Sequence, residues 1–400
     1  MPLLMLLFCI YSILISRVIS IYISVYFIII ILLTKDILKY KISTKHLIKR
    51  FIPDELNKID VLIHAVSCGE SKLTVPIIKK LEEKNIKIKL SVHTPTGFEL
   101  VKKYTNKAFL KPYDLFFTTF YMFYKLRPKV IIISVSDTWP YFILFSKLFG
   151  CKIFYVNYKI KKNKVLRNYI HYIISEKIYL SQQKIETRKY SYLGDLKLLE
   201  KKNNIINNKN KIRIIIASAN KNEFDLHLEY IKYLIKKYPE IQIIYVPRHL
   251  NWLDFFNNKI KDIYYYFINN IDDIDKYDNN LFICWKIGLL NQLYSKTNIC
   301  LMGDTFNNIG GHNLIEPCLN KNTILTGPNV HTIQNQINIL DNVIINKNLN
   351  ELIINTEYLI VNKKYNKYGE DNYKCIINKK SQIEKNLDKL ILELLIQCNN

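Results

Sequence analysis

Glycine and proline are both scarce in this chain, with 10 and 11 residues among 400. Their scarcity argues against a collagen-like region or a long disordered region. The eight cysteines include no Cys-x-x-Cys pair, and most of them lie in apolar segments. We therefore expect reduced, buried thiols in a protein that faces the cytosol, rather than a disulfide framework or a zinc site.

Acidic residues are also few, because 34 Asp and Glu stand against 58 Lys and Arg, for a net charge of +24. Such an excess favours anionic partners such as nucleotide sugars, phosphorylated lipids or a negative membrane surface. The alternative is a coding bias, since the chain is rich in Lys, Asn, Ile and Tyr, as AT-rich genomes produce. No basic stripe with interleaved aromatic residues is present, so the charge does not predict nucleic-acid binding.

Residues 1–33 are almost wholly apolar and are interrupted only by Arg17. A secretory signal would need a charged start, a shorter apolar core and a small-residue cleavage site, and the segment has none of these. A run of this length can span a bilayer as one helix, and the basic residues that follow it would hold that end on the cytoplasmic side. We therefore expect residues 1–34 to be a membrane anchor, either a single span or a shallow interfacial helix.

Beyond residue 50, short β-branched runs alternate with helix-like segments, a pattern typical of parallel sheets covered by helices on both faces. The polar stretch at residues 201–211 cannot bury apolar area and predicts a linker. The sequence thus predicts an α/β fold of two Rossmann-like domains facing a cleft, at residues 35–200 and 212–365. A C-terminal helical segment is expected at residues 366–400, and packing of this segment back on the first domain is one alternative. The expected strands are Val61–Cys68, Ile86–Thr94, Val130–Ser136, Lys152–Tyr158, Arg213–Ala219, Ile241–Arg248, Leu281–Trp285, Ile299–Gly303 and Thr323–Gly327.

The segment HAVSCGE, residues 64–70, ends the first expected strand and leads into a helix. Ligands of such folds bind at the carboxyl ends of the strands, so Glu70 is placed where a carboxylate can meet a substrate hydroxyl. A helix N-terminus favours the charged form of an acid. The pattern alone therefore also fits an ordinary first-turn acid with no role in chemistry.

Two further segments predict an anion site in the second domain. In NNIGGHNLIEP, residues 307–317, the pair Gly310–Gly311 lets the backbone approach a ligand closely. A helix expected to begin at about Asn313 would present N–H groups to phosphate, with Glu316 one turn in, near ribose hydroxyls. In VPRH, residues 246–249, Arg248 offers a fork of donors to phosphate or carboxylate. A tight turn and a surface arginine are the ordinary alternatives.

In this order and spacing, the motifs resemble the 3-deoxy-D-manno-octulosonic acid (Kdo) transferases of lipid A assembly. The pair HA-x-S-x-GE and IGGHN-x-x-EP is close to diagnostic of that family. The matching segments run over nearly the whole chain: HAVSCGE, TPTG (94–97), KPYD (111–114), RPK (127–129), DTWP (137–140), VNYK (156–159), LGDLK (193–197), VPRH, IGGHNLIEP (309–317) and TGP (326–328).

The resemblance implies a GT-B glycosyltransferase with an N-terminal membrane-anchor helix. Such an enzyme moves Kdo from CMP-Kdo to lipid A precursor (lipid IVA) in lipopolysaccharide biosynthesis, with inversion and with no metal or other cofactor. It lies on an anionic inner (cytoplasmic) membrane, with its catalytic domains on the cytoplasmic face, and binds no nucleic acid. Glu70 matches the family's catalytic base, which would take the proton of the acceptor hydroxyl. Asp137 is the backup acid.

The resemblance also assigns binding roles. The acceptor side would include Ser67, Gly69 and Lys159. The donor side, where the leaving phosphate must be stabilised, would consist of Arg248, Gly310, Gly311, His312, Asn313 and Glu316.

The chain departs from the family pattern at several positions. The family's E-T-E-L-W-P appears here as V-S-D-T-W-P, so that Val135 replaces the first acid. Asn220 replaces a histidine of the segment after the linker, and Asp195 and Lys159 replace an asparagine and an arginine. Two alternatives therefore stay open. One is a related GT-B glycosyltransferase that uses another nucleotide sugar, and the other is a catalytically weakened membrane protein that binds lipid A precursor.

Overall fold

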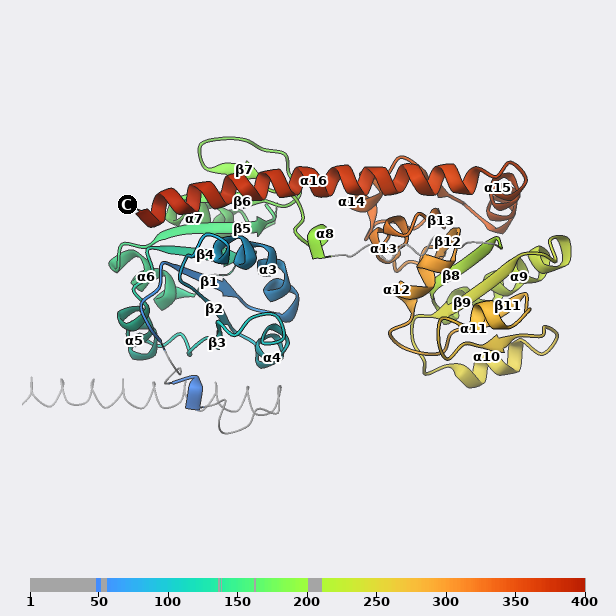
Figure 1. Ribbon diagram of the computed structural model, residues 1–400, viewed down its shortest axis with the longest axis horizontal. Helices are drawn as coiled ribbons and strands as arrows, with labels where there is room; N and C mark the ends of the chain where they lie inside the picture. Colours follow the sequence, from blue (N-terminus) through green and yellow to red (C-terminus); the bar gives the residue numbers. More distant parts are fainter. Residues whose placement is uncertain are drawn as a thin grey trace, which may run out of the picture. The chain divides into compact units, whose positions relative to one another are not determined.

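A computed structural model describes residues 48–51, 56–135, 137, 139–161, 163–200 and 211–399 (Figure 1). The chain divides into two compact units: unit 1 is Met1–Leu196 with Asn386–Asn400, and unit 2 is Lys197–Lys385. The expected anchor, residues 1–34, and nearly all of the expected linker lie outside the described residues. Within the described ranges, no helix combines the length and the apolar character needed to cross a membrane.

Unit 1 contains one seven-stranded parallel sheet in the order β3-β2-β1-β4-β5-β6-β7. Its strands are β1 (Val61–Ala65), β2 (Ile88–Val92), β3 (Ala108–Leu110), β4 (Val130–Ser134), β5 (Lys152–Tyr158), β6 (Lys177–Leu180) and β7 (Tyr190–Tyr192). The central strands β1 and β4 are buried along their whole length. Such continuous apolar runs are expected of a parallel sheet that helices cover on both faces.

The helices of unit 1 divide between the two faces of this sheet. They are α3 (Cys68–Glu82), α4 (Pro95–Val101), α5 (Phe116–Leu126), α6 (Pro140–Leu148) and α7 (Val165–Ile174). The connections through α3 and α4 build the sheet toward one edge, and those through α6 and α7 build it toward the other. Because such crossovers are right-handed, α3 and α4 cover one face, and α5, α6 and α7 cover the opposite face. Apolar side chains of α5 and α6 pack there on β4 and β5.

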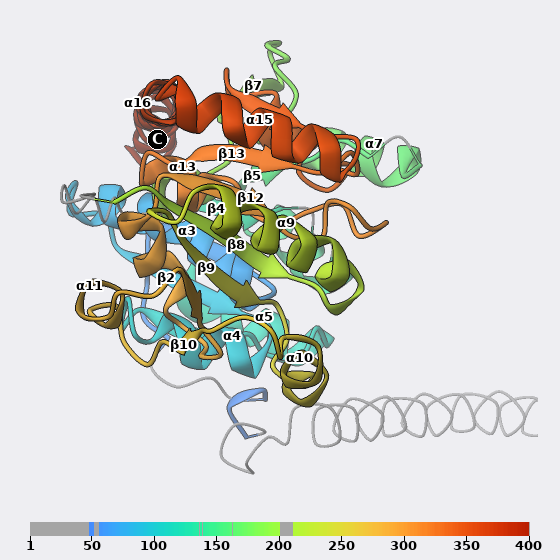
Figure 2. The same ribbon diagram turned by 90° about the vertical axis from the view of Figure 1, so that its right-hand side faces the viewer.

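Unit 2 repeats this architecture with the strand order β10-β11-β9-β8-β12-β13-β14. The strands are β8 (Arg213–Ala219), β9 (Gln242–Pro247), β10 (Tyr266–Phe267), β11 (Leu281–Ile283), β12 (Ile299–Met302), β13 (Thr323–Thr326) and β14 (Val343–Ile345). The α-helices are α8 (Lys197–Glu200), α9 (Phe224–Lys237), α10 (Leu253–Lys259), α11 (Asp273–Lys276), α12 (Leu290–Leu293), α13 (Ile315–Leu319), α14 (Gln334–Ile337) and α15 (Leu349–Val361), and the 3₁₀ helices are η1 (Lys221–Glu223) and η2 (Tyr294–Lys296). Helices α9 and α15 pack together over the sheet, joined by a 2.9 Å hydrogen bond between Tyr230 and Thr356 (Figure 2).

The long helix α16 (Lys364–Asn399) belongs to both units, and the division falls at Asn386. Within unit 1, its last turns pair with the sheet and with α3: Asp388 accepts from Lys80 at 2.6 Å, and Glu393 from Lys177 at 2.6 Å. The sequence analysis places a boundary at 366. The structure divides the chain about 20 residues later, inside an unbroken helix.

Two parallel α/β domains are therefore confirmed, and a strand is present at each of the nine expected positions. Five short strands escape the sequence analysis, namely β3, β6, β7, β10 and β14.

Candidate active site

Each sheet has one point where the order of its strands reverses: between β1 and β4 in unit 1, and between β8 and β12 in unit 2. Connections leave these neighbouring strands toward opposite faces, so a ligand-binding crevice opens at their carboxyl ends. Most of the sequence-predicted residues lie on the segments that follow these four strands. Ser67, Gly69 and Glu70 follow β1, and Asp137 follows β4, whereas Gly310–Glu316 follow β12.

Glu70 is fixed at the start of α3 by a capping box. Its Oε2 accepts hydrogen bonds from the backbone N–H groups of Val66 at 2.8 Å and Ser67 at 3.2 Å, and Ser67 Oγ accepts from Glu70 N at 3.4 Å. Helix α3 begins at Cys68, inside the HAVSCGE segment. The carboxylate is half-buried, and its second oxygen, Oε1, is not part of the capping box. The capping box thus fixes Oε2 and leaves Oε1 outside its hydrogen bonds, where Oε1 can accept a proton.

A side-chain pair joins β1 to the segment after β4. His64 Nε2 lies 3.1 Å from Asp137 Oδ2, and His64 Nδ1 lies 2.8 Å from Ser91 Oγ on the neighbouring strand β2. The indole N–H of Trp139 also donates to Asp137. His64 is buried, and burial lowers its pKa, so the neutral ring donates from Nε2 to the carboxylate and accepts the Ser91 hydroxyl at Nδ1. This chain of contacts joins β2, β1 and the segment after β4.

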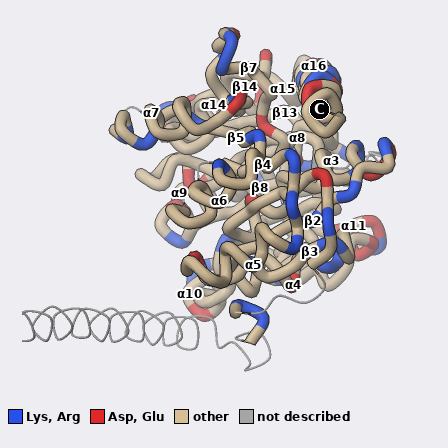
Figure 3. Tube along the Cα trace, turned by 90° about the vertical axis from the view of Figure 1, so that its left-hand side faces the viewer, with Lys and Arg blue, Asp and Glu red and all other residues tan. Residues whose placement is uncertain are grey.

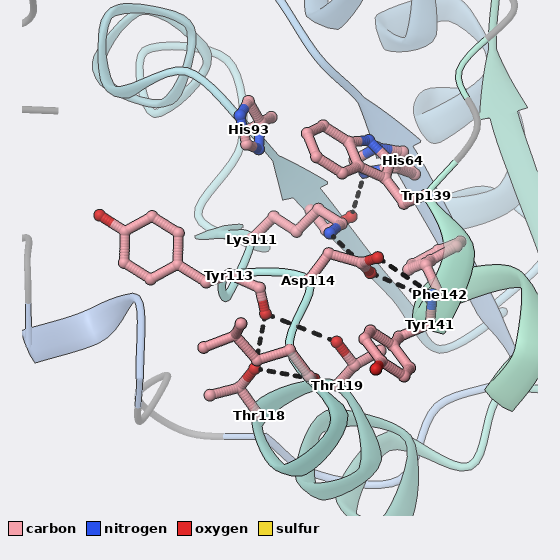
Figure 4. Close-up of polar contacts among 12 residues, drawn as sticks. His64, His93, Lys111, Tyr113, Asp114, Thr118, Thr119, Trp139, Tyr141 and Phe142 are labelled. Carbon is pink, nitrogen blue, oxygen red and sulfur yellow. Dashed lines mark hydrogen bonds and ion pairs between the residues drawn. The ribbon is translucent and has the colours of Figure 1, made fainter. Parts of the chain in front are cut away.

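Lys111 is a buried cation next to this pair. Its Nζ lies 3.5 Å from Asp114 Oδ1 and 4.6 Å from the centre of the Trp139 ring (Figure 4). Asp114 in turn accepts the N–H groups of Tyr141 and Phe142, at 3.0 Å each, and so caps α6. The KPYD segment thereby ties the end of β3 to the start of α6, beside Asp137.

Burial and charge set the protonation of this cluster. Burial lowers the pKa of Lys111 to about 8 and that of His93 to about 2. For Asp137, burial acts to raise the pKa, but the hydrogen bonds from His64 and Trp139 outweigh it and hold the pKa below its usual value. A carboxylate held ionised in this way is a weak base. Asp137 therefore suits a supporting role better than proton abstraction.

Two further positions of the first domain, Lys159 and Val135, directly follow strands β5 and β4. Lys159 is half-buried directly after β5. Val135, at the family's first acid position, has φ of 69° and donates its N–H to Val156 O at 2.8 Å. A β-branched residue rarely adopts a left-handed backbone. The turn that carries Asp137 is thus strained where it leaves β4, and such strain is common at functional sites.

In unit 2, the loop after β12 folds around the Asp304 carbonyl. Gly310 N and Gly311 N donate to that oxygen at 2.9 and 2.8 Å, and both glycines have positive φ, at 97° and 87°. The Asp304 carboxylate lies 2.6 Å from His312 Nε2. Thr332 Oγ1 then donates to the carbonyls of both glycines, at 2.6 and 2.8 Å, from the segment after β13.

Glu223 holds this loop from across the crevice. It ends η1, directly after β8, and is buried. One carboxylate oxygen accepts Asp304 N at 2.7 Å, and the other accepts Phe306 N at 2.6 Å and Asn307 N at 3.1 Å. Asn220 caps the same short turn, because its Oδ1 accepts Asn222 N at 3.1 Å. The asparagine that departs from the family pattern thus has a structural role in this chain.

Three expectations for this loop need correction. The helix does not begin at about Asn313: α13 begins at Ile315 and has five residues, because Asn313 Oδ1 accepts Ile315 N at 3.1 Å and ends the turn there. Glu316 therefore lies at the start of the helix rather than one turn in. The amides expected to be free for phosphate are engaged, those of the glycines by Asp304 O and that of Leu314 by Gln336 Oε1 at 2.7 Å.

The other donor-side residues differ in placement. Arg248 follows β9, the strand beside β8, with its N–H on Ala219 O at 2.8 Å and its side chain exposed. His331, which the sequence analysis does not single out, lies so close to Gly310 that a Cβ there would be 2.5 Å from its ring. The functional candidates that sequence reasoning misses are therefore His331, Glu223, His64 and Lys111. His64 and Lys111 belong to the recognised segments HAVSCGE and KPYD, and Glu223 follows Asn220 in the segment after the linker, so only their contacts are hidden.

A metal site is absent from the described residues, and a cavity lies apart from the predicted site residues. The described ranges contain no group of three or more His, Cys, Asp or Glu side chains able to hold a metal ion. A cavity of about 570 Å³ lies in unit 1, away from every sequence-predicted site residue. Its lining includes Tyr172, Lys177, Arg188, Lys189 and Glu393.

Comparisons with known proteins show which proteins this chain is similar to. The family model described as 3-deoxy-D-manno-octulosonic-acid transferase matches residues 44–195. The transferase of that name from Aquifex aeolicus is 27% identical over 72% of this chain and 82% of its own length. The one from Chlamydia muridarum is 25% identical over 68% of this chain and 71% of its own length.

Solved structures match in fold. The UDP-GlcNAc 2-epimerase of Neisseria meningitidis, bound to UDP-GlcNAc, covers 83% of this chain and all of its own, with a TM-score of 0.55 and 15% identity. The MurG protein of Acinetobacter baumannii covers 84% of this chain and 99% of its own, with a TM-score of 0.51 and 11% identity. At such identities the likeness concerns the fold alone. With the sequence relatives, it makes this protein a glycosyltransferase built from two GT-B-like domains. Within that class, the chain is similar to the Kdo transferases, in the family model over residues 44–195 and in the curated relatives.

Proposed function

We propose that this enzyme transfers Kdo from CMP-Kdo to the lipid A precursor lipid IVA, with inversion at the anomeric carbon. The observation that carries the proposal is the position of Glu70. It lies in the segment that the family model covers, at the carboxyl end of β1, with one carboxylate oxygen held by the capping box. A base that is already oriented acts without first losing side-chain freedom.

In the proposed step, Glu70 Oε1 takes the proton from the acceptor hydroxyl as that oxygen bonds to the anomeric carbon of Kdo. The bond from that carbon to the CMP phosphate breaks, and the phosphate keeps the electron pair. Proton removal by a positioned carboxylate contributes about 10²–10⁴-fold to the rate. Asp137, held ionised by His64 and Trp139, supports the crevice floor under the acceptor, and we assign Ser67, Gly69 and Lys159 to acceptor contacts.

Donor binding is assigned to the segments after β9 and β12. Arg248 is exposed at a strand end, where its guanidinium can pair with the leaving phosphate. The Gly310–Gly311 turn brings the backbone close to the ligand, with His312, Asn313 and Glu316 next to it. Because the glycine amides donate to Asp304 O, phosphate binding by these amides requires the turn to rearrange.

The test is incubation of the purified full-length protein with a CMP-Kdo-generating system and tetraacylated lipid A precursor, followed by mass spectrometry. The proposal predicts a product that has gained one or more Kdo residues. Parallel samples with UDP-sugars in place of CMP-Kdo test the alternative donor. Products from a UDP-sugar alone would replace the proposal.

We further propose an inner-membrane location, with both catalytic units on the cytoplasmic face. The support is the apolar run of residues 1–33, followed by a basic cluster. An acceptor that carries acyl chains is also presented at a membrane surface.

The weakened-enzyme alternative rests on Val135 and Asn220. Asn220 caps the η1 turn, so its presence does not by itself indicate lost activity. Val135 is the stronger support, since it removes a carboxylate beside the crevice. A protein that binds lipid IVA but forms no product with any donor would favour this alternative.

A further inference from the structure

The outer surface of helices α5 and α6 carries an unusual group of exposed apolar side chains. Phe117 is 81% exposed and Leu148 is 69% exposed. We call this group the aromatic face, and it consists of Phe116, Phe117, Phe120, Tyr121, Tyr124, Tyr141, Leu144 and Leu148. Single exposed apolar residues are normal on a soluble protein, but a contiguous group of this size marks an interaction surface.

Ring contacts show that the aromatic face is continuous. Phe116 packs edge-on against Phe117 at 5.4 Å and against Tyr141 of the neighbouring helix at 6.0 Å. Phe120 stacks on Tyr124 at 6.1 Å, and its inner edge meets the buried Phe145 at 5.6 Å. The face is therefore one surface, supported from below by the core of unit 1.

The charged side chains of α5 and α6 are all basic. Neither α5 nor α6 contains an acidic residue. Lys125 lies 5.7 Å from the centre of the Tyr121 ring, and the Arg127 guanidinium lies 5.2 Å from that of Tyr124. Figure 3 shows α5 and α6 as largely uncharged stretches of the trace. Exposed aromatic rings with cations at their edge are typical of surfaces that lie at a membrane–water interface.

The chain enters unit 1 next to this face. The segment Ile48–Phe51 follows the apolar and basic N-terminal region and is anchored on Tyr113, three residues ahead of α5. Tyr113 N donates to Arg50 O at 3.0 Å, and the rings of Phe51 and Tyr113 meet at 5.3 Å. An N-terminal region held at a bilayer would therefore bring the start of α5 to the same bilayer.

We propose that the aromatic face of α5 and α6 lies in the headgroup region of an anionic lipid bilayer. The inference rests on the membrane location proposed above and adds which surface of unit 1 meets the lipid. Phenylalanine and leucine side chains enter the acyl boundary, the tyrosine hydroxyls stay in the headgroup layer, and Lys125 and Arg127 pair with lipid phosphates.

The test places one new tryptophan at a time in the full-length chain. Leu148→Trp and Phe117→Trp lie on the aromatic face. Leu392→Trp is a matched control at an exposed leucine of α16, in the part of that helix that packs with α3 on the other face of the sheet. Each variant is bound to vesicles of phosphatidylethanolamine and phosphatidylglycerol, with or without bromine on the acyl chains. Wild-type emission from the three native tryptophans is subtracted.

We expect brominated lipid to quench most of the added emission of Leu148→Trp and Phe117→Trp, and aqueous acrylamide to quench little of it. The control should show the reverse. Vesicle-bound protein in which both face tryptophans stay open to acrylamide would overturn the proposal. The proposal would also be overturned if both face tryptophans were shielded from bromine and from acrylamide and the protein had twice its mass in gel filtration. That result would identify a second copy of the chain as the occupant of the face. If no variant or wild type binds vesicles, the membrane location fails as well, whereas Kdo transfer, measured separately with detergent-solubilised acceptor, is unaffected.

Discussion

Each unit joins the two strands at the reversal point of its own sheet, and the two units do so with different chemistry. In unit 1, the contact across the reversal point joins two side chains, His64 of β1 and Asp137 after β4. In unit 2, the Glu223 side chain after β8 holds three backbone N–H groups after β12. A side-chain pair depends on the protonation of both partners. A carboxylate on backbone amides fixes the path of the chain, whatever side chains the loop carries.

This difference suits the roles proposed for the units. In the proposed role, unit 1 holds a reacting hydroxyl beside a base, and neighbouring side chains hold the charge of Asp137 in place. Unit 2 is to hold a phosphate against a glycine turn, so its loop must be shaped by the backbone. The predictions below test each half of this comparison.

The largest expected effect is that of Glu70→Gln in unit 1. Glutamine can keep the capping box but cannot take a proton, so turnover should fall by at least about 10²-fold. Because the base acts in the transition state, KM and thermal stability should change little. Steady-state transfer assays and thermal unfolding provide the measurements. The control is Glu83→Gln, at the exposed C-terminal end of the same helix. Normal turnover in Glu70→Gln, with loss in Asp137→Asn, would move the role to Asp137.

Arg248→Ala tests the charge that unit 2 offers to the donor. The loss of a charge-assisted contact costs about 1.5–3 kcal/mol, or roughly 10–100-fold in donor use. Acceptor affinity should stay unchanged, because Arg248 belongs to unit 2. Donor titrations at saturating acceptor measure the effect, and an unchanged kcat/KM for CMP-Kdo would remove Arg248 from the site.

Glu223→Gln should weaken the hydrogen bonds that hold the loop after β12, and so lower the stability of unit 2. The amide has one acceptor oxygen where the carboxylate has two, and its NH₂ group would face backbone donors. Leaving buried N–H groups unpaired costs about 1–3 kcal/mol. Denaturant unfolding of this variant and of the matched Glu229→Gln, exposed on α9, measures the difference. Equal stability of the two variants would show that the loop keeps its path without the hydrogen bonds to the Glu223 carboxylate.

The central strands of the fold are predictable from sequence because they are buried on both faces. Runs such as Val130–Ser134 are apolar throughout, and they stand out between helix-like segments. Strands β7 and β14 do not, because each is a three-residue strand at the end of a sheet and is only partly buried. Pairing along one edge holds such a strand through backbone hydrogen bonds, and these leave no pattern in the side chains.

The same distinction applies to the candidate site. The capping box of Glu70 spans four consecutive positions, so Ser67 and Glu70 predict it directly. The partners His64 and Asp137 are 73 residues apart, and Glu223 lies 81 residues from Asp304. Only the folded sheet brings these residues together. Motif reasoning therefore finds the segments but not the contacts between them, and it misplaces the start of α13, which a local asparagine contact decides.

A pair of glycine substitutions sharpens the contrast between the units. Gly310 has φ of 97°, and a Cβ there would meet the His331 ring. The exposed imidazole can swing away, so the main cost of Gly310→Ala is backbone strain, about 1–2 kcal/mol. At Gly69, a Cβ would meet nothing within 4 Å, and alanine in α3 should gain about 0.5–1 kcal/mol. Midpoints of urea unfolding would measure both changes. A loss of stability in Gly69→Ala as large as that in Gly310→Ala would contradict this account.

The smallest expected effect is a difference in acid sensitivity. Among the described residues of unit 1, burial lowers the pKa of three histidines: the buried His64, the half-buried His93 to about 2, and the buried His171 to about 4. Because the unfolded chain binds these protons near pH 6.5 and the folded unit does not, stability falls as pH drops below about 6.5. The slope is about 1.4 kcal/mol per pH unit for each histidine. In unit 2, burial lowers the pKa of His227 to about 3 but raises that of Glu223.

A raised carboxyl pKa acts with the opposite sign, since folded unit 2 then binds more protons than the unfolded chain as pH falls. The two groups of unit 2 therefore offset each other in part, whereas the three histidines of unit 1 add. Unit 1 should lose stability first between pH 6.5 and 5. Trp139 reports on unit 1, because its ring lies 4.6 Å from that of His93, and Trp252 and Trp285 report on unit 2. Fluorescence of single-tryptophan variants during urea unfolding at several pH values would separate the units. His93→Gln should reduce the slope of unit 1 by one proton and leave that of unit 2 unchanged, and equal slopes in both units would remove the histidines as the cause.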